Sequence, residues 1–146
     1  MGELIGGYTH GDSTIGCNQR VMWVEDGVGM TAGKVYAVGP ALLTEAIPNA
    51  EIHLPCVALK TSASGDKVQV GIEGVFEAWL KAGTLTAGDG IRSDNSEALA
   101  VCTESAATDN PGDQTADEIG FVVTAGSGGS KDSVIYLYGL PVLSIA

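Results

Sequence analysis

Residues 57–70 read VALKTSASGDKVQV, in which two apolar strands flank a turn of small and polar residues. In the second strand Val68 and Val70 alternate with polar side chains, which is typical of an antiparallel strand with one buried face. A strand, a small-residue turn and a returning strand predict a β-hairpin. An all-β domain can be built from units of this kind.

The same unit recurs further along the chain. Residues 121–134 read FVVTAGSGGSKDSV, which again gives a strand, a small-residue turn and a returning strand. Ahead of the two hairpins lie TAGKVY at residues 31–36 and TAGDGI at 86–91, each of which predicts a turn that starts a strand. The second copy is longer between its turn and its hairpin, and its extra residues fall in the acidic segment 103–118. The pattern favours two similar halves packed about a pseudo-twofold axis.

Other short runs are rich in β-branched and aromatic residues and are bounded by turn formers, so they predict further strands. These runs are Val21 to Val24, Lys34 to Val38, Lys67 to Ile72 and Val134 to Tyr138. The last run is apolar on both faces and is therefore expected at the centre of a sheet or against another subunit. Residues 41–47 and 75–81 fit either a short helix or a strand.

We therefore expect an all-β protein, a small antiparallel β-barrel or β-sandwich, with a single domain over residues 21–146. Residues 1–20 are dominated by Gly, Thr, Ser, Asp and Asn and offer little apolar surface to bury. They are expected to form an extended N-terminal arm, which either frays or becomes ordered on a neighbouring molecule.

Charge and composition exclude several classes of partner. The 146 residues include 18 Asp plus Glu but only 7 Lys plus Arg, for a formal net charge of −11. So few scattered bases cannot neutralise a run of phosphates, which excludes nucleic acid and disfavours anionic membrane surfaces. The N-terminus lacks the pattern of a signal peptide, and no uncharged stretch is long enough to cross a bilayer. We expect no membrane association.

Few side chains are suited to catalysis or to metal binding. His53 is the nearest to a catalytic base, and alternation places it beside Glu51 on a polar surface. His53 and Cys56 lack the second pair of ligands that a zinc site needs. The Gly-rich segment 126–133 lacks the residue order and the following helix of a phosphate-binding loop. We expect no enzymatic activity, no cofactor and no metal.

The cysteines and the acidic segment lead to similarly plain expectations. Cys17, Cys56 and Cys102 are too few and too widely spaced for a self-contained disulfide framework. Cys56 and Cys102 lie in apolar runs and are expected to be buried, whereas Cys17 in the polar arm is the candidate for a cross-link between chains. The segment 103–118 does not fit a twelve-residue calcium loop, so a solvated loop is expected.

The segments LTAGDGI at residues 85–91 and VALKTSASGDKVQVGIEGV at 57–75 resemble the head-decoration, or capsid-cement, proteins of tailed bacteriophages. In that family an apolar-Ala-Gly-Asp turn starts a strand, and an Ala-x-Gly-Asp-x-Val-x-Val hairpin ends near a Gly. The similarity extends over residues 29–139. It departs from the family pattern in the long acidic segment and at residues 130–132, where Ser-Lys-Asp replaces the second Gly-Asp.

The resemblance implies a structural protein of the virion that binds the outer surface of the phage head, often as a homotrimer. Such a protein stabilises the head by bridging neighbouring subunits of the major capsid protein, and no catalytic residue carries over. The strong negative charge suits an outer surface, because packaged DNA would repel it. The expected capsid or subunit contacts are apolar, aromatic and histidine side chains of the arm and of the C-terminal strand: Leu4, Ile5, Tyr8, His10, Val134, Tyr136, Tyr138 and Leu140.

An alternative from another class is a free β-sandwich binding module of a fibre or adhesin, with a glycan or cell-surface ligand. It would present exposed aromatic rings as a stacking platform, for which the candidates are Trp23, Trp79, Tyr136 and Tyr138. Packing in the core is the competing explanation for each ring. A small hydrolase that uses His53 is a third hypothesis, for which no supporting group of residues is found.

Overall fold

The computed structural model describes residues 19–48, 51–80, 85–93, 102–104, 118–127 and 131–143. Their regular structure is almost all strand: β1 (Gln19–Glu25), β2 (Val35–Val38), β3 (Thr44–Glu45), β4 (Ile52–Ala58), β5 (Lys67–Ala78), β6 (Gly90–Ser93), β7 (Cys102–Glu104), β8 (Gly120–Thr124), β9 (Ser133–Leu137) and β10 (Val142–Leu143). A single turn of 3-10 helix (Pro40–Leu42) precedes β3, and no α-helix occurs in these ranges. The predicted all-β class is confirmed.

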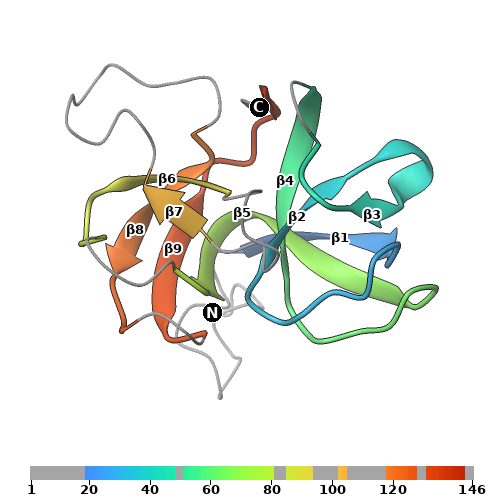
Figure 1. The fold of residues 1–146 in the computed structure, drawn as a ribbon, viewed down its shortest axis with the longest axis horizontal. Helices are drawn as coiled ribbons and strands as arrows, with labels where there is room; N and C mark the ends of the chain where they lie inside the picture. The colour runs from blue at the N-terminus through green and yellow to red at the C-terminus, as the bar shows by residue number, and fades with distance from the viewer. Residues whose placement is uncertain are drawn as a thin grey trace, which may run out of the picture.

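The strands pair antiparallel in the order β3-β2-β4-β5-β9-β8-β6-β7, while β1 joins β5 and β10 joins β4. Among the described residues this sheet does not close into a barrel. In Figure 1, β1 to β4 lie on the right, β6 to β9 lie on the left, and β5 curves through the middle between them. The molecule therefore has two lobes that share one strand.

The described strands enclose two hydrophobic cores. The larger, here called the β9 core, consists of Val35, Ala37, Ile47, Val57, Phe76, Ala78, Leu80, Ile91, Ile119, Val122, Ile135, Leu137 and Val142. The smaller, here called the β1 core, consists of Val24, Met30, Tyr36, Cys56, Ala58, Val68, Val70 and Ile72.

Strands β2 and β4 separate the two cores. Successive residues on each strand point to opposite faces, so Val35 and Val57 enter the β9 core while Tyr36 and Cys56 enter the β1 core. This arrangement explains why both strands are apolar on both faces. Cys56 is fully buried, as expected, and burial raises the pKa of its thiol to about 12, so it is an inert packing residue.

Strand β5 is 12 residues long and supplies both cores. Val70 packs in the β1 core and Phe76 in the β9 core. Between them the ladder with β1 contains a bulge, since Arg20 lies opposite Glu73 but Val21 lies opposite Gly71. A methyl group added at Gly71 would overlap the ring of Phe76, so the fold requires glycine at this point.

The predicted internal duplication is visible in the hydrogen bonds. Gly33 and Gly88 occupy matching turns, with φ angles of 86° and 95° that favour glycine. The Gly33 amide donates to the carbonyl of Ala58 at 2.8 Å, and the Gly88 amide donates to the carbonyl of Val122 at 2.8 Å. Because the two hairpins align Ala58 with Val122, the matching residues of both copies make the same contact.

Strand pairing decides the conformation of the two segments, 41–47 and 75–81, that fit either a helix or a strand. Residues 75–78 belong to β5 and pair with β9, so the helical alternative is wrong there. Residues 41–47 contain the end of the 3-10 turn and the short strand β3, which pairs with β2. Strand β9 lies between β5 and β8, with Ile135 and Leu137 in the core, and this confirms its predicted central place.

Gly71→Ala is expected to lower the free energy of unfolding by about 1–3 kcal/mol, because the new methyl group overlaps a buried ring. Urea denaturation of the variant against Gln69→Ala, an exposed position on the same strand, measures this. The double variant Gly71→Ala/Phe76→Leu should recover part of the loss. Equal stability of Gly71→Ala and the wild type would contradict the proposed role of this contact.

Candidate functional site

Trp23 lies on the outer face of β1 with 62% of its surface exposed, so the explanation that it packs in the core is wrong. Its partner across the ladder is Gln69, which is also exposed, while the neighbouring Val24 points into the β1 core. Trp23 borders a groove of about 320 Å³, here called the Trp23 groove, whose other lining residues are Val24, Glu25, Ala41, Leu42 and Lys67.

The far wall of the Trp23 groove is a strained apolar loop. Ala41 and Leu42 have φ angles of 60° and 58°, in the left-handed region that non-glycine residues rarely adopt. Such a residue costs about 1–3 kcal/mol and persists only where its surroundings enforce it. Leu42 and Leu43 are nonetheless 50% and 41% exposed. The loop therefore holds apolar side chains out of the core, as expected of a contact site.

Hydrogen bonds at the base of the loop enforce this conformation. The Gly39 amide donates to the carbonyl of Leu43 at 2.9 Å, and the Leu43 amide donates to the carbonyl of Pro40 at 3.2 Å. The buried hydroxyl of Thr44 accepts from the Gly27 amide at 3.1 Å. These bonds join the loop to the end of β1, so the two walls of the groove are fixed relative to each other.

A buried carboxylate fixes the chain just beyond the groove. Asp26 is fully buried and accepts hydrogen bonds from the amides of Val28, Gly29 and Met30 and from the hydroxyl of Ser62. Burial alone would raise the pKa of Asp26, but these four donors outweigh it and hold the pKa below its usual value. The ionised carboxylate therefore stabilises this corner of the fold, and that contribution is lost as the pH falls through its lowered pKa.

A second candidate surface lies at the other end of β1, where the N-terminal arm joins the domain. Arg20 forms an ion pair with Glu73 at 3.0 Å, and Gly139 packs so closely on Glu73 that a side chain there would clash. Leu140, the next residue, is 62% exposed. The structure thus brings the start of the domain next to two of the predicted contact residues, Tyr138 and Leu140.

The other predicted contacts of the C-terminal strand line one outer face of the sheet. Val134 and Tyr136 are half-buried and alternate with core residues, and Tyr136 stacks on Phe121 with ring centroids 5.5 Å apart. Tyr138 lies 6.3 Å from Phe121 and donates its hydroxyl to Glu118 at 2.8 Å. Burial, reinforced by Glu118, raises the pKa of Tyr138 to about 12. We call these rings the aromatic face.

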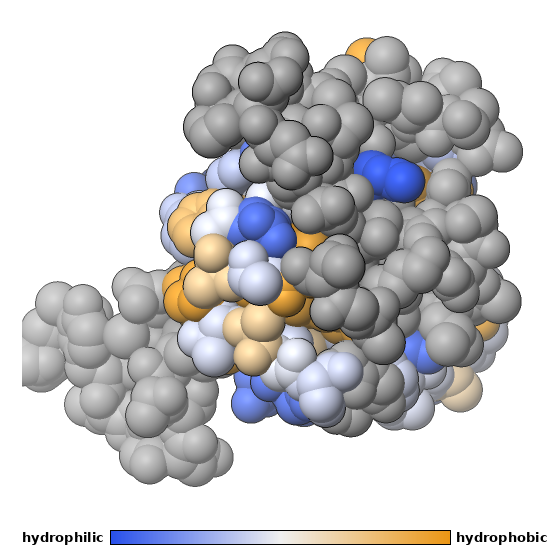
Figure 2. Space-filling model, turned by 60° about the vertical axis from the view of Figure 1, so that its left-hand side comes forward, coloured by the Kyte–Doolittle hydropathy of each residue, from blue (hydrophilic) through white to orange (hydrophobic). Residues whose placement is uncertain are grey.

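Figure 2 turns the side that carries β6 to β9 toward the viewer, and described apolar side chains gather there between polar ones. Phe121 and Tyr136 are stacked with an interplanar angle of 20°, whereas Tyr138 is tilted by 42° against Phe121 and by 53° against Tyr136, so the three rings do not form one plane. A flat platform for a sugar needs parallel, well-exposed rings. The geometry is better suited to packing against protein.

Several predicted residues lie outside the described part of the chain. These are Leu4, Ile5, Tyr8, His10 and Cys17 of the arm and residues 105–117 of the acidic segment. Their roles stay predictions. Conversely, the sequence analysis missed Ala41 and Leu42 as site residues, although the uncharged run Pro-Ala-Leu-Leu at 40–43 between Gly39 and Thr44 was a usable signal.

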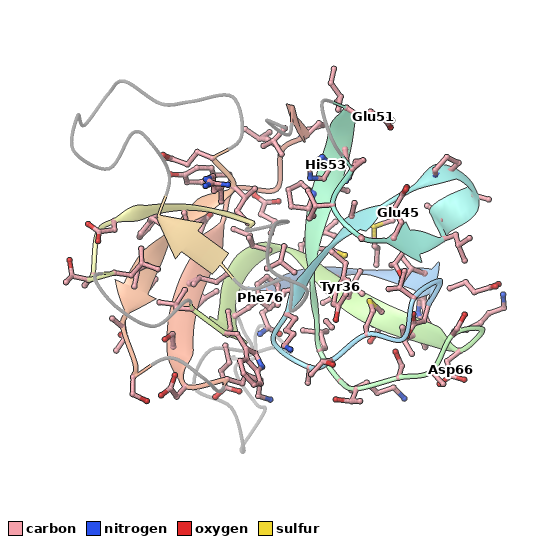
Figure 3. All side chains as sticks on the ribbon, in the orientation of Figure 1. Tyr36, Glu45, Glu51, His53, Asp66 and Phe76 are labelled. Carbon is pink, nitrogen blue, oxygen red and sulfur yellow. The ribbon has the colours of Figure 1, made fainter. Side chains whose placement is uncertain are left out.

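The prediction that His53 lies on a polar surface is wrong. His53 is only 8% exposed, whereas its neighbour Ile52 is 75% exposed, so the alternation of β4 runs opposite to the prediction. The reason is long-range, because β10 pairs with β4 at His53. Figure 3 shows His53 on β4, with Glu51 nearer the end of the lobe; Glu45 is on β3, which is separated from β4 by β2. The pairing of β10 with β4 therefore buries His53, although histidine side chains are often exposed.

No cluster of side chains suited to binding a metal ion is found in the part of the chain that the structure describes. Within that part no three His, Cys, Asp or Glu side chains are grouped so as to hold a metal ion. Nor does any helix in these ranges have the length and apolar character to span a membrane. The features that stand out are apolar contact surfaces.

An open antiparallel fold with exposed apolar surfaces is thus the class that the geometry defines. No protein-family model matches the sequence, and none of the curated proteins matches it. The structure is similar to that of the N base of the head fiber gp8.5 of bacteriophage phi29, with a TM-score of 0.54 and 14% sequence identity. The match covers 85% of this chain and 98% of that chain. It establishes a shared fold.

The buried imidazole leads to a pH prediction. Burial lowers the pKa of His53, while the carbonyl of Glu51 and the charge of Glu45 oppose this only in part. Because the unfolded chain binds the proton more readily, stability is full above the ordinary pKa of 6.5 and falls as the pH drops through the lowered value. Thermal unfolding of the wild type should show this loss between pH 7 and 5, and His53→Leu should not. The same loss in both proteins would assign it to other groups.

Proposed function

We propose that this protein is a structural component of a phage virion that binds the outer surface of the capsid as a homotrimer and bridges neighbouring subunits of the major capsid protein. The observation that carries the proposal is the fold shared with the phi29 head fiber base over nearly the whole of both chains. The sequence resemblance to head-decoration proteins points independently to the same class of virion protein.

The positions of the contact surfaces support a bridging role. A protein that joins two capsid subunits needs at least two separate contact surfaces. The Trp23 groove lies toward the end of β1, while the start of β1 adjoins Leu140. Arg20 and Trp23, which mark the two surfaces, are three residues apart, or about 10 Å at 3.3 Å per residue. The proposal assigns these two separate surfaces of one molecule to two neighbouring subunits.

Because many copies bind the same capsid, a modest contact in each copy is sufficient to stabilise the shell. Each copy needs only a small apolar interface, because many copies on one shell act together and trimers engage several sites at once. With a net charge of −11, the protein is repelled by packaged DNA, which is consistent with a position on the outer surface of the capsid. This role needs no catalytic residue, cofactor or metal, and we propose none.

The double variant Trp23→Ala/Leu42→Ala is expected to weaken binding to capsids of the source virus at least tenfold, or by about 1.4 kcal/mol, because it removes both apolar walls of the groove. Co-sedimentation with capsids that lack the protein measures the affinity. Ile52→Ala is the matched control, since Ile52 is 75% exposed but lies outside the groove. Undiminished binding by the double variant would remove the groove from the proposal.

Deletion of residues 1–18 is expected to leave a folded domain that no longer binds capsids. The core residues that the structure describes all lie between Val24 and Val142, and the deletion removes none of them. Circular dichroism and thermal unfolding establish the fold, and the same co-sedimentation assay measures binding. A folded deletion variant with full capsid binding would refute the contact role of the arm.

One observation favours a second candidate, a binding module for a glycan or cell-surface ligand. Trp23 presents an exposed indole beside a groove, which is a common arrangement for stacking on a sugar ring. Trp79 does not serve this purpose, because the ammonium of Lys34 lies over its ring face, 4.5 Å from the centroid. Glycan binding by the isolated protein that is lost in Trp23→Ala, together with no association with capsids, would favour this candidate.

A further inference from the structure

His53 has one ring nitrogen that is hydrogen-bonded and one that is not. Nδ1 lies 3.3 Å from the carbonyl oxygen of Glu51, which can only accept a hydrogen bond, so Nδ1 carries the proton of the neutral ring. Nε2 is enclosed, and it forms no hydrogen bond within the described part of the chain. A second proton on His53 must therefore add at Nε2, a nitrogen that is closed off from solvent and has no acceptor beside it.

The imidazole of His53 faces the β9 core. Val57 belongs to that core and lies four residues further along β4, so the two side chains are on the same face of the strand. Strand β10 places Val142 directly opposite His53, and directly paired residues of antiparallel strands share a face. Val142 is itself a buried member of the β9 core. A protonated ring would put a charge at the edge of this apolar core.

Two acidic residues are the titratable groups that act on His53 within the described residues. Strand β3 contributes Glu45, whose negative charge favours the protonated ring, and β4 contributes Glu51 through its carbonyl. Tyr36 of β2 points into the other core, and the two residues of β10 are apolar. Burial outweighs the favourable charge, so the pKa of His53 lies below its ordinary value of 6.5. The chain resists protonation here while β10 is in place.

Strand β10 is the part of this environment that is held by the shortest ladder. It consists of Val142–Leu143 and pairs with β4 at two positions, whereas β2 pairs with β4 at four. The chain reaches β10 through Gly139, whose φ angle of 77° is left-handed, and then through Leu140 and Pro141, which are both exposed. Detaching β10 therefore costs less than separating any longer pair of strands.

Strand β10 also connects the two lobes. In Figure 1 the red end of the chain leaves β9 in the left-hand lobe and runs toward the upper end of β4 in the right-hand lobe. The Tyr138 amide donates to the carbonyl of Ile119 at 3.0 Å, which anchors the end of β9 in its own lobe. Residues 139–143, here called the clasp, thus join the lobes in addition to the shared strand β5.

We infer that the clasp is released by acid, because addition of a proton to Nε2 of His53 detaches β10 from β4. In the detached state water reaches Nε2 and accepts the hydrogen bond that the core does not provide. The release uncovers Val142 and the end of β4, while β5 keeps its pairing with β1 and β9. The inference concerns a single chain and does not depend on the proposed function.

The sign and range of the pH effect follow from the two states. The detached state has an exposed imidazole with the ordinary pKa of 6.5, whereas the pKa in the clasped state is lower. The detached fraction is therefore constant well above pH 6.5 and rises as the pH falls through the interval between the two values. A fall to one unit below 6.5 raises it by up to about tenfold. The clasp is closed at neutral pH.

The test is hydrogen–deuterium exchange of the full chain at about pH 7.5 and about pH 5.5, with rates corrected for the intrinsic effect of pH on exchange. Peptides covering residues 138–143 and 51–54 should exchange several times faster, up to about tenfold, at the lower pH. A peptide covering residues 67–73, where β5 pairs with β1, should not change. His53→Leu should keep the clasp protected at both pH values. The matched control is His10→Leu, which removes the other histidine of the chain and should behave like the wild type.

Three outcomes would overturn the inference: an unchanged clasp peptide in the wild type, an equal loss of protection at residues 67–73, and the same loss in His53→Leu. The second outcome would mean that the whole domain opens instead of the clasp. Circular dichroism establishes that each variant is folded. If His53→Leu does not fold, His53→Gln takes its place, because it keeps a polar side chain that does not titrate.

Discussion

The fold depends on the packing of Phe76 over Gly71 in the middle of β5. This contact lets one strand leave the β1 core and enter the β9 core without a break in its backbone pairing. Because the two cores share β5 as well as the wall of β2 and β4, neither lobe can bury its apolar surface alone. The two lobes are therefore expected to unfold together as one cooperative unit.

The same strand fixes the positions of the contact surfaces. Trp23 is placed by its register with Gln69, and Tyr136 is placed by its register with Val75, which lies six residues further along β5. The distance between the Trp23 groove and the aromatic face is thus a property of a paired strand and not of flexible loops. Surfaces held on regular strands keep the spacing that a bridging protein requires.

Most of the fold could be predicted because its signals are local. The hairpin at 57–70 and its repeat at 121–134 are recognisable from turn residues and alternation alone, and the matching bonds of Gly33 and Gly88 show that the repeat is structural. Strand β9 was recognisable as central because it is apolar on both faces. Local turn chemistry and side-chain period are sufficient for such features.

The errors arise where distant segments decide the outcome. His53 is buried because β10 pairs with β4 from about ninety residues away, which no local pattern indicates. Trp23 is exposed because the neighbouring Val24 packs in the β1 core, so the alternation of side chains along β1 directs Trp23 to the opposite, outer face. The left-handed Ala41 and Leu42 have no propensity signal, since their conformation is imposed by the hydrogen bond from the Gly39 amide to the Leu43 carbonyl and by the bond that the Thr44 hydroxyl accepts from the Gly27 amide. The site was harder to predict than the fold because it consists of such exceptions.

The charge of the chain determines what kind of contact can hold it in an assembly. With a net charge of −11, each copy repels the next over roughly a Debye length, about 8 Å at physiological salt. Binding must then come from short-range apolar contact, which salt does not screen, and from rare positions where a cation is held in place. The loop of Ala41 and Leu42 keeps its strained backbone and holds the side chains of Leu42 and Leu43 exposed, and these apolar side chains are the kind of surface that the proposed capsid contact would cover. In the proposed function, contact through such exposed apolar side chains offsets the repulsion between acidic copies because it acts at short range and is not weakened by salt.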